Sequence, residues 1–293
     1  MRVTVLGLAM GLAMGLAFSG VARAQPLLHA VGLESQYANV MAQIGGPYVQ
    51  VTSVESDPNT DPHEFELSPD VVKQLAGADV IVANGLGYDA WADTLLAETG
   101  GKVITAQAAL GLPDSTPNPH LWYLPATMPA VARAVAAAFA AKDPAHAAQY
   151  AANEKSFDAS LQHWVQALAQ LKLQYAGTKV AVTEPVADYL LQAAGLDIAT
   201  PFSLQAAIMN GTDPAPQDVS AQQALLTPGT VAVFVYNEQV TDTQTGSFLA
   251  LAQNNDIPVL GVFELMPAGA KSYQVWMQQE TAALGQALAA SGH

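Results

Sequence analysis

The 293-residue chain contains no cysteine. This absence excludes disulfide bonds, metal sites built on thiolates, cysteine nucleophiles and the acylated cysteine that tethers a bacterial lipoprotein. Basic residues are also scarce, since 10 Lys and Arg stand against 25 Asp and Glu and the formal net charge is −15. Such an acidic chain repels nucleic acid and anionic lipid, so we expect no nucleic-acid partner.

Long apolar runs are missing as well, except at the beginning of the chain. Arg2 is followed by an almost uncharged run over residues 3–18 and by the small-residue pattern Ala22-Arg23-Ala24. This order is typical of a secretory signal peptide, residues 1–24, with cleavage after Ala24. The run is near the lower limit of about 17 to 25 residues for a membrane span, and no later segment reaches that length. We therefore expect a protein exported to the periplasm and free in solution.

The first part of the exported chain alternates between strand-like and helix-like patterns. Hydrophobic residues make up 51% of the sequence, which is enough for a large hydrophobic core. The length of the chain favours two such cores. The expected strands are 27–31, 48–54, 79–83 and 102–106, and the expected helices are 35–44, 68–76 and 89–99. Strands separated by helices of this length indicate βαβ units and a mainly parallel sheet covered on both faces.

An Ala-rich helical tract over residues 125–175 separates this alternation from a second one. Lys142-Asp143-Pro144 interrupts the tract, because the residue before proline resists the helical conformation. The later expected strands are 179–183, one near 199, 231–236 and 259–263, and the later helices are 186–194, 216–226, 246–254 and 273–290. The prediction is an α/β protein with two Rossmann-like lobes, residues 25–143 and 177–293, joined by one long connecting helix over 144–176.

Two of the six histidines share an uncommon setting. His63 lies in Asp61-Pro62-His63-Glu64 and His120 lies in Asn118-Pro119-His120-Leu121-Trp122, each shortly before a predicted helix. In both, proline stiffens a loop that joins a strand to a helix. A single histidine is more often a surface or hydrogen-bonded residue, but loops at the carboxyl ends of parallel strands line ligand crevices. The matching pair therefore predicts a binding site.

Two carboxylates occupy comparable places in the second half. Glu184 follows the buried strand that ends at Thr183, and Glu264 follows the strand that ends at Phe263. A lone Glu at a strand end is usually a solvated residue. Two imidazoles and two carboxylates at four strand ends, however, make a sound four-residue site for a divalent cation, whose charge the carboxylates neutralise.

These motifs resemble the zinc/manganese (cluster A-I, TroA-like) periplasmic substrate-binding proteins of bacterial metal ABC transporters. The resemblance rests on 61-DPHEFELSP-69, on Ala83-Asn84-Gly85-Leu86-Gly87 followed by Trp91, and on Asn118-Pro119-His120-Leu121-Trp122, in the family's order and spacing. It covers essentially the whole chain after the signal peptide. The resemblance implies that four side chains bind one metal ion, and residue by residue these are His63, His120, Glu184 and Glu264.

Some positions depart from the zinc-specific pattern. Glu184 stands where zinc members have His and matches members that bind manganese or iron, and Glu264 stands where Asp is more usual. The stretch 111–118 contains no histidine, so the His-rich acidic loop of many zinc members is absent. Glu238 and Asp242 are the reserve candidates for the fourth ligand. The implied cargo is therefore Mn²⁺ or Zn²⁺, with Fe²⁺ as a third option.

The resemblance implies a monomeric solute-binding protein, not an enzyme, whose partner is the membrane permease of a metal ABC importer. A secreted metal-dependent hydrolase is one alternative. His63-Glu64 is not followed by a second His four residues later, so the zincin motif is absent, and four protein ligands suit a closed site without an open water position. A surface adhesin is the other alternative, for which the chain offers neither a lipid anchor nor repeats.

Overall fold

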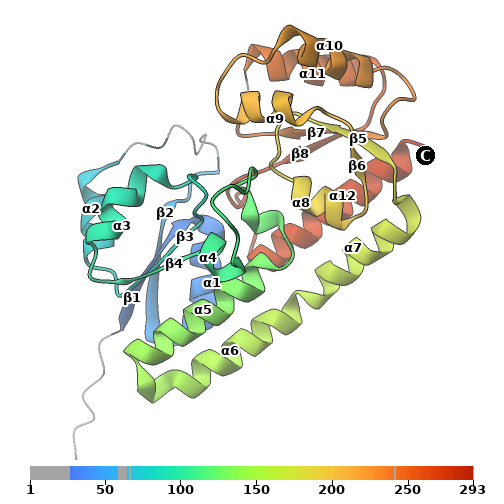
Figure 1. Cartoon of the computed structure of the whole chain (residues 1–293). Coiled ribbons are helices and arrows are strands. Elements are labelled where there is room, and N and C mark those ends of the chain that lie inside the picture. Colours follow the sequence, from blue (N-terminus) through green and yellow to red (C-terminus); the bar gives the residue numbers. More distant parts are fainter. Residues whose placement is uncertain (1–26, 59–64, 66, 241, 293) are drawn as a thin grey trace, which may run out of the picture.

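The computed structural model describes residues 27–58, 65, 67–240 and 242–292, and Figure 1 shows its two α/β lobes and the long helices beside them. The predicted signal peptide and His63 lie outside the described residues. Within the described residues, no helix combines the length and the apolar character needed to cross a membrane.

The first lobe is built on a four-stranded parallel sheet with the order β2-β1-β3-β4. Its strands are β1 (Leu28–Glu34), β2 (Val49–Glu55), β3 (Val80–Ala83) and β4 (Lys102–Thr105). Its helices are α1 (Ser35–Gly45), α2 (Pro69–Ala76), α3 (Asp93–Glu98) and α4 (Ala106–Leu110). The predicted start of α2 is confirmed, since the Ser68 side chain accepts a hydrogen bond from the backbone of Val71 and caps the helix.

The second lobe repeats this plan, with a parallel sheet in the order β6-β5-β7-β8. Its strands are β5 (Lys179–Val182), β6 (Asp197–Ile198), β7 (Val233–Asn237) and β8 (Val259–Val262). Its helices are α8 (Asp188–Ala193), α9 (Phe202–Met209), α10 (Pro216–Leu225), α11 (Thr243–Asn254) and α12 (Tyr273–Ala290). The predicted fold class is confirmed. Helices α4 and α9 were not predicted. The expectation that the His120 loop joins a strand to a helix is therefore wrong, because α4 lies between β4 and this loop.

Three long helices follow one another along the side of the molecule (Figure 1). The first lies beside the first lobe, and the next two extend from the first lobe to the second. They are α5 (Thr127–Lys142), α6 (Ala147–Ser160) and α7 (Gln162–Tyr175). Helix α6 packs on α1 and α5, whereas α7 packs on α12. The predicted connection is thus made by α6 and α7, with the single residue Leu161 between them.

The largest apolar core is continuous across the two sheets. Successive residues of a strand point to opposite faces of the sheet. Val82 of β3 and Val182 of β5 face the shared core. Their neighbours Ile81 and Ala181 face two smaller clusters, one in each lobe. Aromatic rings join the lobes, and the ring centroids of Tyr123 and Trp276 lie 5.6 Å apart. The shared core therefore holds the carboxyl ends of the two sheets close together.

Candidate metal-binding site

Three of the four predicted ligand residues lie in the described part of the chain, and all three are buried at element ends. His120 precedes the short helix η4 (Leu121–Tyr123), Glu184 follows β5 after Thr183, and Glu264 follows β8 after Phe263. Their exposed fractions are 0%, 3% and 0%. Because buried ionisable groups are costly without partners, these positions need specific interactions.

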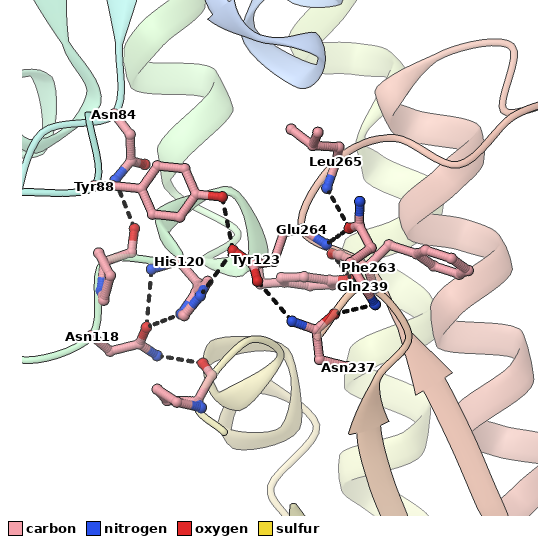
Figure 2. Close-up of polar contacts among 12 residues, drawn as sticks. Asn84, Tyr88, Asn118, His120, Tyr123, Asn237, Gln239, Phe263, Glu264 and Leu265 are labelled. Atoms are coloured by element: carbon pink, nitrogen blue, oxygen red, sulfur yellow. Dashed lines mark hydrogen bonds and ion pairs between the residues drawn. The ribbon is translucent and has the colours of Figure 1, made fainter. Parts of the chain in front are cut away.

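The structure brings His120 and Glu264 together across the two lobes. Nε2 of His120 lies 3.5 Å from Oε2 of Glu264 (Figure 2). The two residues come from different lobes, as the predicted site requires. Among the described residues, Nε2 of His120 has no hydrogen-bond partner, although it is fully buried. A buried imidazole nitrogen of this kind is a suitable metal ligand.

Asn118 determines which nitrogen of His120 carries the proton. Its Nδ2 donates to the carbonyl oxygen of Pro185 over 2.8 Å, and a carbonyl can only accept, so the orientation of the amide is defined. Oδ1 of Asn118 then lies 2.8 Å from Nδ1 of His120 and accepts its hydrogen. The lone pair of the neutral ring is consequently on Nε2, the nitrogen that faces Glu264.

The same contacts tie the His120 loop to the segment that carries Glu184. Besides the Asn118–Pro185 bond, the hydroxyl of Tyr189 donates to the carbonyl oxygen of Asn118 over 2.9 Å. Pro185 directly follows Glu184 and Tyr189 lies in α8, so both contacts join the second lobe to the first. The backbone next to Glu184 is thereby fixed relative to His120.

The carboxylate of Glu264 is oriented by one donor from each lobe (Figure 2). The Tyr88 hydroxyl donates to Oε2 over 2.8 Å, and Nδ2 of Asn237 donates to Oε1 over 2.7 Å. Burial, reinforced by the Glu264 carboxylate, holds the pKa of Tyr88 well above its ordinary value, so Tyr88 remains a neutral donor. The sequence motif 83–91 and the segment 236–242 contain these two residues, but nothing in the sequence indicated their contact with Glu264.

The two reserve ligand candidates lie elsewhere. Glu238 is exposed, and its carboxylate accepts a hydrogen bond from the Tyr236 hydroxyl over 3.3 Å. Asp242 caps the start of α11 by accepting from the backbone of Thr245 over 2.6 Å. Both side chains have structural partners outside the His120–Glu264 region.

A group of buried carboxylates that sequence reasoning missed lies at the carboxyl ends of β1 and β2. Glu34 and Glu55 are register partners in the two strands, and Asp89 lies next to Glu34. Burial and the neighbouring Asp89 raise the pKa of Glu34 well above its ordinary value. This shift in pKa favours the neutral form of Glu34, which limits the negative charge beside Tyr88.

Within the described part of the chain, no three His, Asp or Glu side chains lie close enough together to hold a metal ion. His120 and Glu264 alone form a two-residue pair that suits Zn²⁺, Mn²⁺ or Fe²⁺, all of which accept imidazole and carboxylate ligands. Glu184 does not form a group of three with this pair, and His63 lies outside the described residues.

Comparisons with known proteins agree on one family. The model of the family described as "ZnuA: Zinc-uptake complex component A periplasmic" matches residues 34–287. The manganese-binding lipoprotein MntA of Bacillus subtilis (strain 168) is 30% identical over 150 residues, which are 48% of this chain and 48% of that protein. The match thus spans about half the length of this curated relative.

Solved structures share the whole fold at low sequence identity. FpvC from Pseudomonas aeruginosa in complex with Mn²⁺ matches with a TM-score of 0.74 and 20% identity, over 90% of this chain and 98% of that one. The periplasmic zinc-binding protein TroA from Treponema pallidum matches with a TM-score of 0.75 and 14% identity, over 89% of this chain and 99% of that one. At these identities the likeness is one of fold.

Proposed function

Since the chain belongs to the ZnuA family of periplasmic zinc-uptake components, we propose that it captures one divalent transition-metal ion and delivers it to the permease of an ABC importer. The observation that carries this proposal is the contact between His120 and Glu264. An imidazole nitrogen with its lone pair available and a buried carboxylate oxygen, 3.5 Å apart, come from opposite lobes. A cation between them joins the two lobes directly.

The proposed ligands are His63, His120, Glu184 and Glu264. Residues 25–143 and 177–293 then contribute two each, and residues 144–176 connect them. Two carboxylates balance the charge of the dication, and the imidazoles supply neutral nitrogen ligands. Because each lobe holds half of the coordination shell, binding stabilises the arrangement in which the lobes are closed, and that arrangement is what the permease recognises.

The proposed cargo is Mn²⁺ or Zn²⁺. MntA is named for manganese and TroA for zinc, and a site with two nitrogens and two carboxylates accepts either metal. Raw affinity follows the general stability order and favours zinc, so selection for manganese depends on the number of ligand atoms and on metal supply. A carboxylate at 184 that binds through both oxygens raises the coordination number above four and favours manganese.

The proposed location is the periplasm, after cleavage of residues 1–24. The family is described as periplasmic and as an uptake component, which supports a transport role and gives no support to the hydrolase or adhesin alternatives. The chain acts as a binding protein rather than an enzyme in this proposal, because a closed four-ligand site leaves no position for a reactive water.

Titration of the purified, metal-free protein with Zn²⁺ and with Mn²⁺ tests the proposal. We expect one ion per chain, and a loss of at least about ten-fold in affinity on His120→Ala, since a direct ligand is removed. The matched control is Glu238→Gln, which alters an exposed carboxylate outside the site and should bind like the parent. Equal binding by the parent and His120→Ala, or no binding by the parent, would contradict the proposal.

A further inference from the structure

Glu264 lies on a short segment, 263–266, whose backbone is hydrogen-bonded by side chains. The Tyr123 hydroxyl donates to the carbonyl oxygen of Phe263 over 2.9 Å, and Nε2 of Gln36 donates to that of Glu264 over 3.2 Å. Met266 donates its backbone hydrogen to the Ser35 hydroxyl over 3.0 Å. Tyr123, Gln36 and Ser35 all belong to the first lobe, so that lobe positions a segment of the second.

Gln239 also bonds to this segment, and Figure 2 shows its contacts with Glu264 and Leu265. Its Oε1 accepts from the backbone nitrogens of Glu264, over 2.5 Å, and Leu265, over 3.0 Å. Its Nε2 donates to the carbonyl oxygen of Pro58 over 3.1 Å. Pro58 follows β2 in the first lobe, on the chain segment that leads to His63. One amide thus bonds both to the Glu264 segment and to the opposite lobe.

Residues at the end of β7 alternate, which explains why Gln239 rather than Glu238 serves the site. Asn237 and Gln239 face Glu264. Glu238 points to the opposite side and covers Gly261, so a side chain at position 261 would collide with the Glu238 carboxylate. Oδ1 of Asn237 also accepts from the backbone nitrogen of Gln239 over 2.9 Å. Asn237 therefore orients both the Glu264 carboxylate and the residue that holds its backbone.

We propose that Gln239 is a positioning residue of the metal site, which fixes Glu264 against the first lobe and thereby raises metal affinity. This inference rests on the proposed function, because it treats Glu264 as a ligand. A ligand that is already held in place loses little conformational freedom when the ion binds. Residues that orient metal ligands typically change affinity by about 10- to 100-fold when they are replaced.

The variant Gln239→Met tests the proposal, because methionine has a similar length and shape but neither donates nor accepts strongly. We expect Zn²⁺ affinity, measured by competition with a chelator, to fall by about ten-fold or more. The matched control is Gln274→Met. Gln274 also bonds across the lobes, to Oε1 of Gln43 in α1 over 2.7 Å, but it contacts no candidate ligand. The control should keep the affinity of the parent.

A double-mutant cycle with Glu264→Gln separates positioning from a general structural role. If Gln239 acts through Glu264, Gln239→Met should cause little further loss in the Glu264→Gln background. Two results would overturn the proposal. One is a loss of Zn²⁺ affinity below two-fold on Gln239→Met in the parent protein, and the other is an equal loss of affinity with and without Glu264→Gln. If Gln239→Met fails to fold, as judged by its unfolding midpoint without metal, Gln239→Asn replaces it, because its shorter amide cannot reach both partners. A parent protein that binds no metal would instead contradict the proposed function.

Discussion

The hydroxyl of Tyr88 donates a hydrogen bond to Oε2 of Glu264 over 2.8 Å, across the boundary between the two lobes. The same oxygen lies 3.5 Å from Nε2 of His120. Oε2 is therefore the atom at which the first lobe, through two side chains, meets the carboxylate of the second. A metal ion bound there would share this oxygen with the Tyr88 hydroxyl, which stays neutral.

Removal of this hydroxyl should weaken metal binding. Tyr88→Phe deletes one oxygen atom, keeps the ring and leaves Oε2 of Glu264 without its donor from the first lobe. We expect a loss of several-fold up to about ten-fold in Zn²⁺ affinity, measured by calorimetry. Tyr236→Phe is the control, because it deletes the same group from a tyrosine bonded to exposed Glu238. Similar affinities for the two variants would rule out this role for Tyr88.

The parts of the fold that depend on local pattern could be predicted from the sequence. Both parallel sheets, the start of α2 after Ser68 and the placement of Glu264 after a strand follow from apolar periodicity and from proline and turn residues. Helix α9 was missed because its residues show no clear alternation of apolar and polar faces. The turn at Leu161 was missed because the sequence there contains neither glycine nor proline.

The partners of the candidate ligands could not be predicted. Tyr88, Asn237 and Gln239 reach Glu264 from other loops, and no local pattern specifies which side chains meet once two sheets pack together. The buried Glu34 is a similar case, since a carboxylate at a strand end is normally exposed to solvent. Its burial depends on the register of β1 and β2, which brings Glu34 beside Glu55.

Asn118 should matter for affinity although it is not a ligand. Asn118→Ala removes the acceptor of the Nδ1 hydrogen of His120 and frees the ring to adopt the other tautomer. We expect a loss of about 10- to 100-fold in Zn²⁺ affinity. Asn153→Ala is a suitable control, because Asn153 also bonds to a backbone carbonyl, that of Ile44, but lies on α6. Unchanged binding by Asn118→Ala would exclude the proposed orientation of His120.

Stability without metal should depend on pH through Glu280, which is 7% exposed. Burial raises the pKa of Glu280 from 4.5 to about 7, so the folded state binds the proton more tightly than the unfolded state. The contribution of Glu280 to the free energy of unfolding is therefore largest below about pH 4.5, where both states carry the proton. It falls as the pH rises from about 4.5 to about 7, and it does not change further above that pH. The fall is roughly 3 kcal/mol, from about 1.4 kcal/mol per pKa unit.

Glu280→Gln should remove this part of the pH dependence, because glutamine does not titrate and can still accept from Nε1 of Trp276. Urea unfolding of the metal-free protein at several pH values measures the effect as a difference between variant and parent. Glu98→Gln, at an exposed carboxylate of α3 in the first lobe, should keep the pH dependence of the parent. Parallel curves for Glu280→Gln and the parent would contradict the raised pKa.

Glu184 should influence the choice of metal. A histidine at this position removes a negative charge and a hard oxygen and limits the residue to one ligand atom, so Glu184→His should shift relative preference towards zinc. The quantity to measure is the ratio of Zn²⁺ to Mn²⁺ affinity at fixed pH, because protons compete for both kinds of ligand. A ratio that stays the same or falls would show that Glu184 does not determine selectivity.

Anomalous diffraction from crystals of the metal-loaded protein, recorded at the absorption edge of the bound metal, would locate the ion itself. We expect one strong peak per chain between the lobes, about 2.0 to 2.2 Å from both Nε2 of His120 and Oε2 of Glu264. Glu184 and His63 should complete the shell around the same peak. A loaded protein whose peak lies away from His120 and Glu264, or is bound by residues of one lobe alone, would contradict the proposed site.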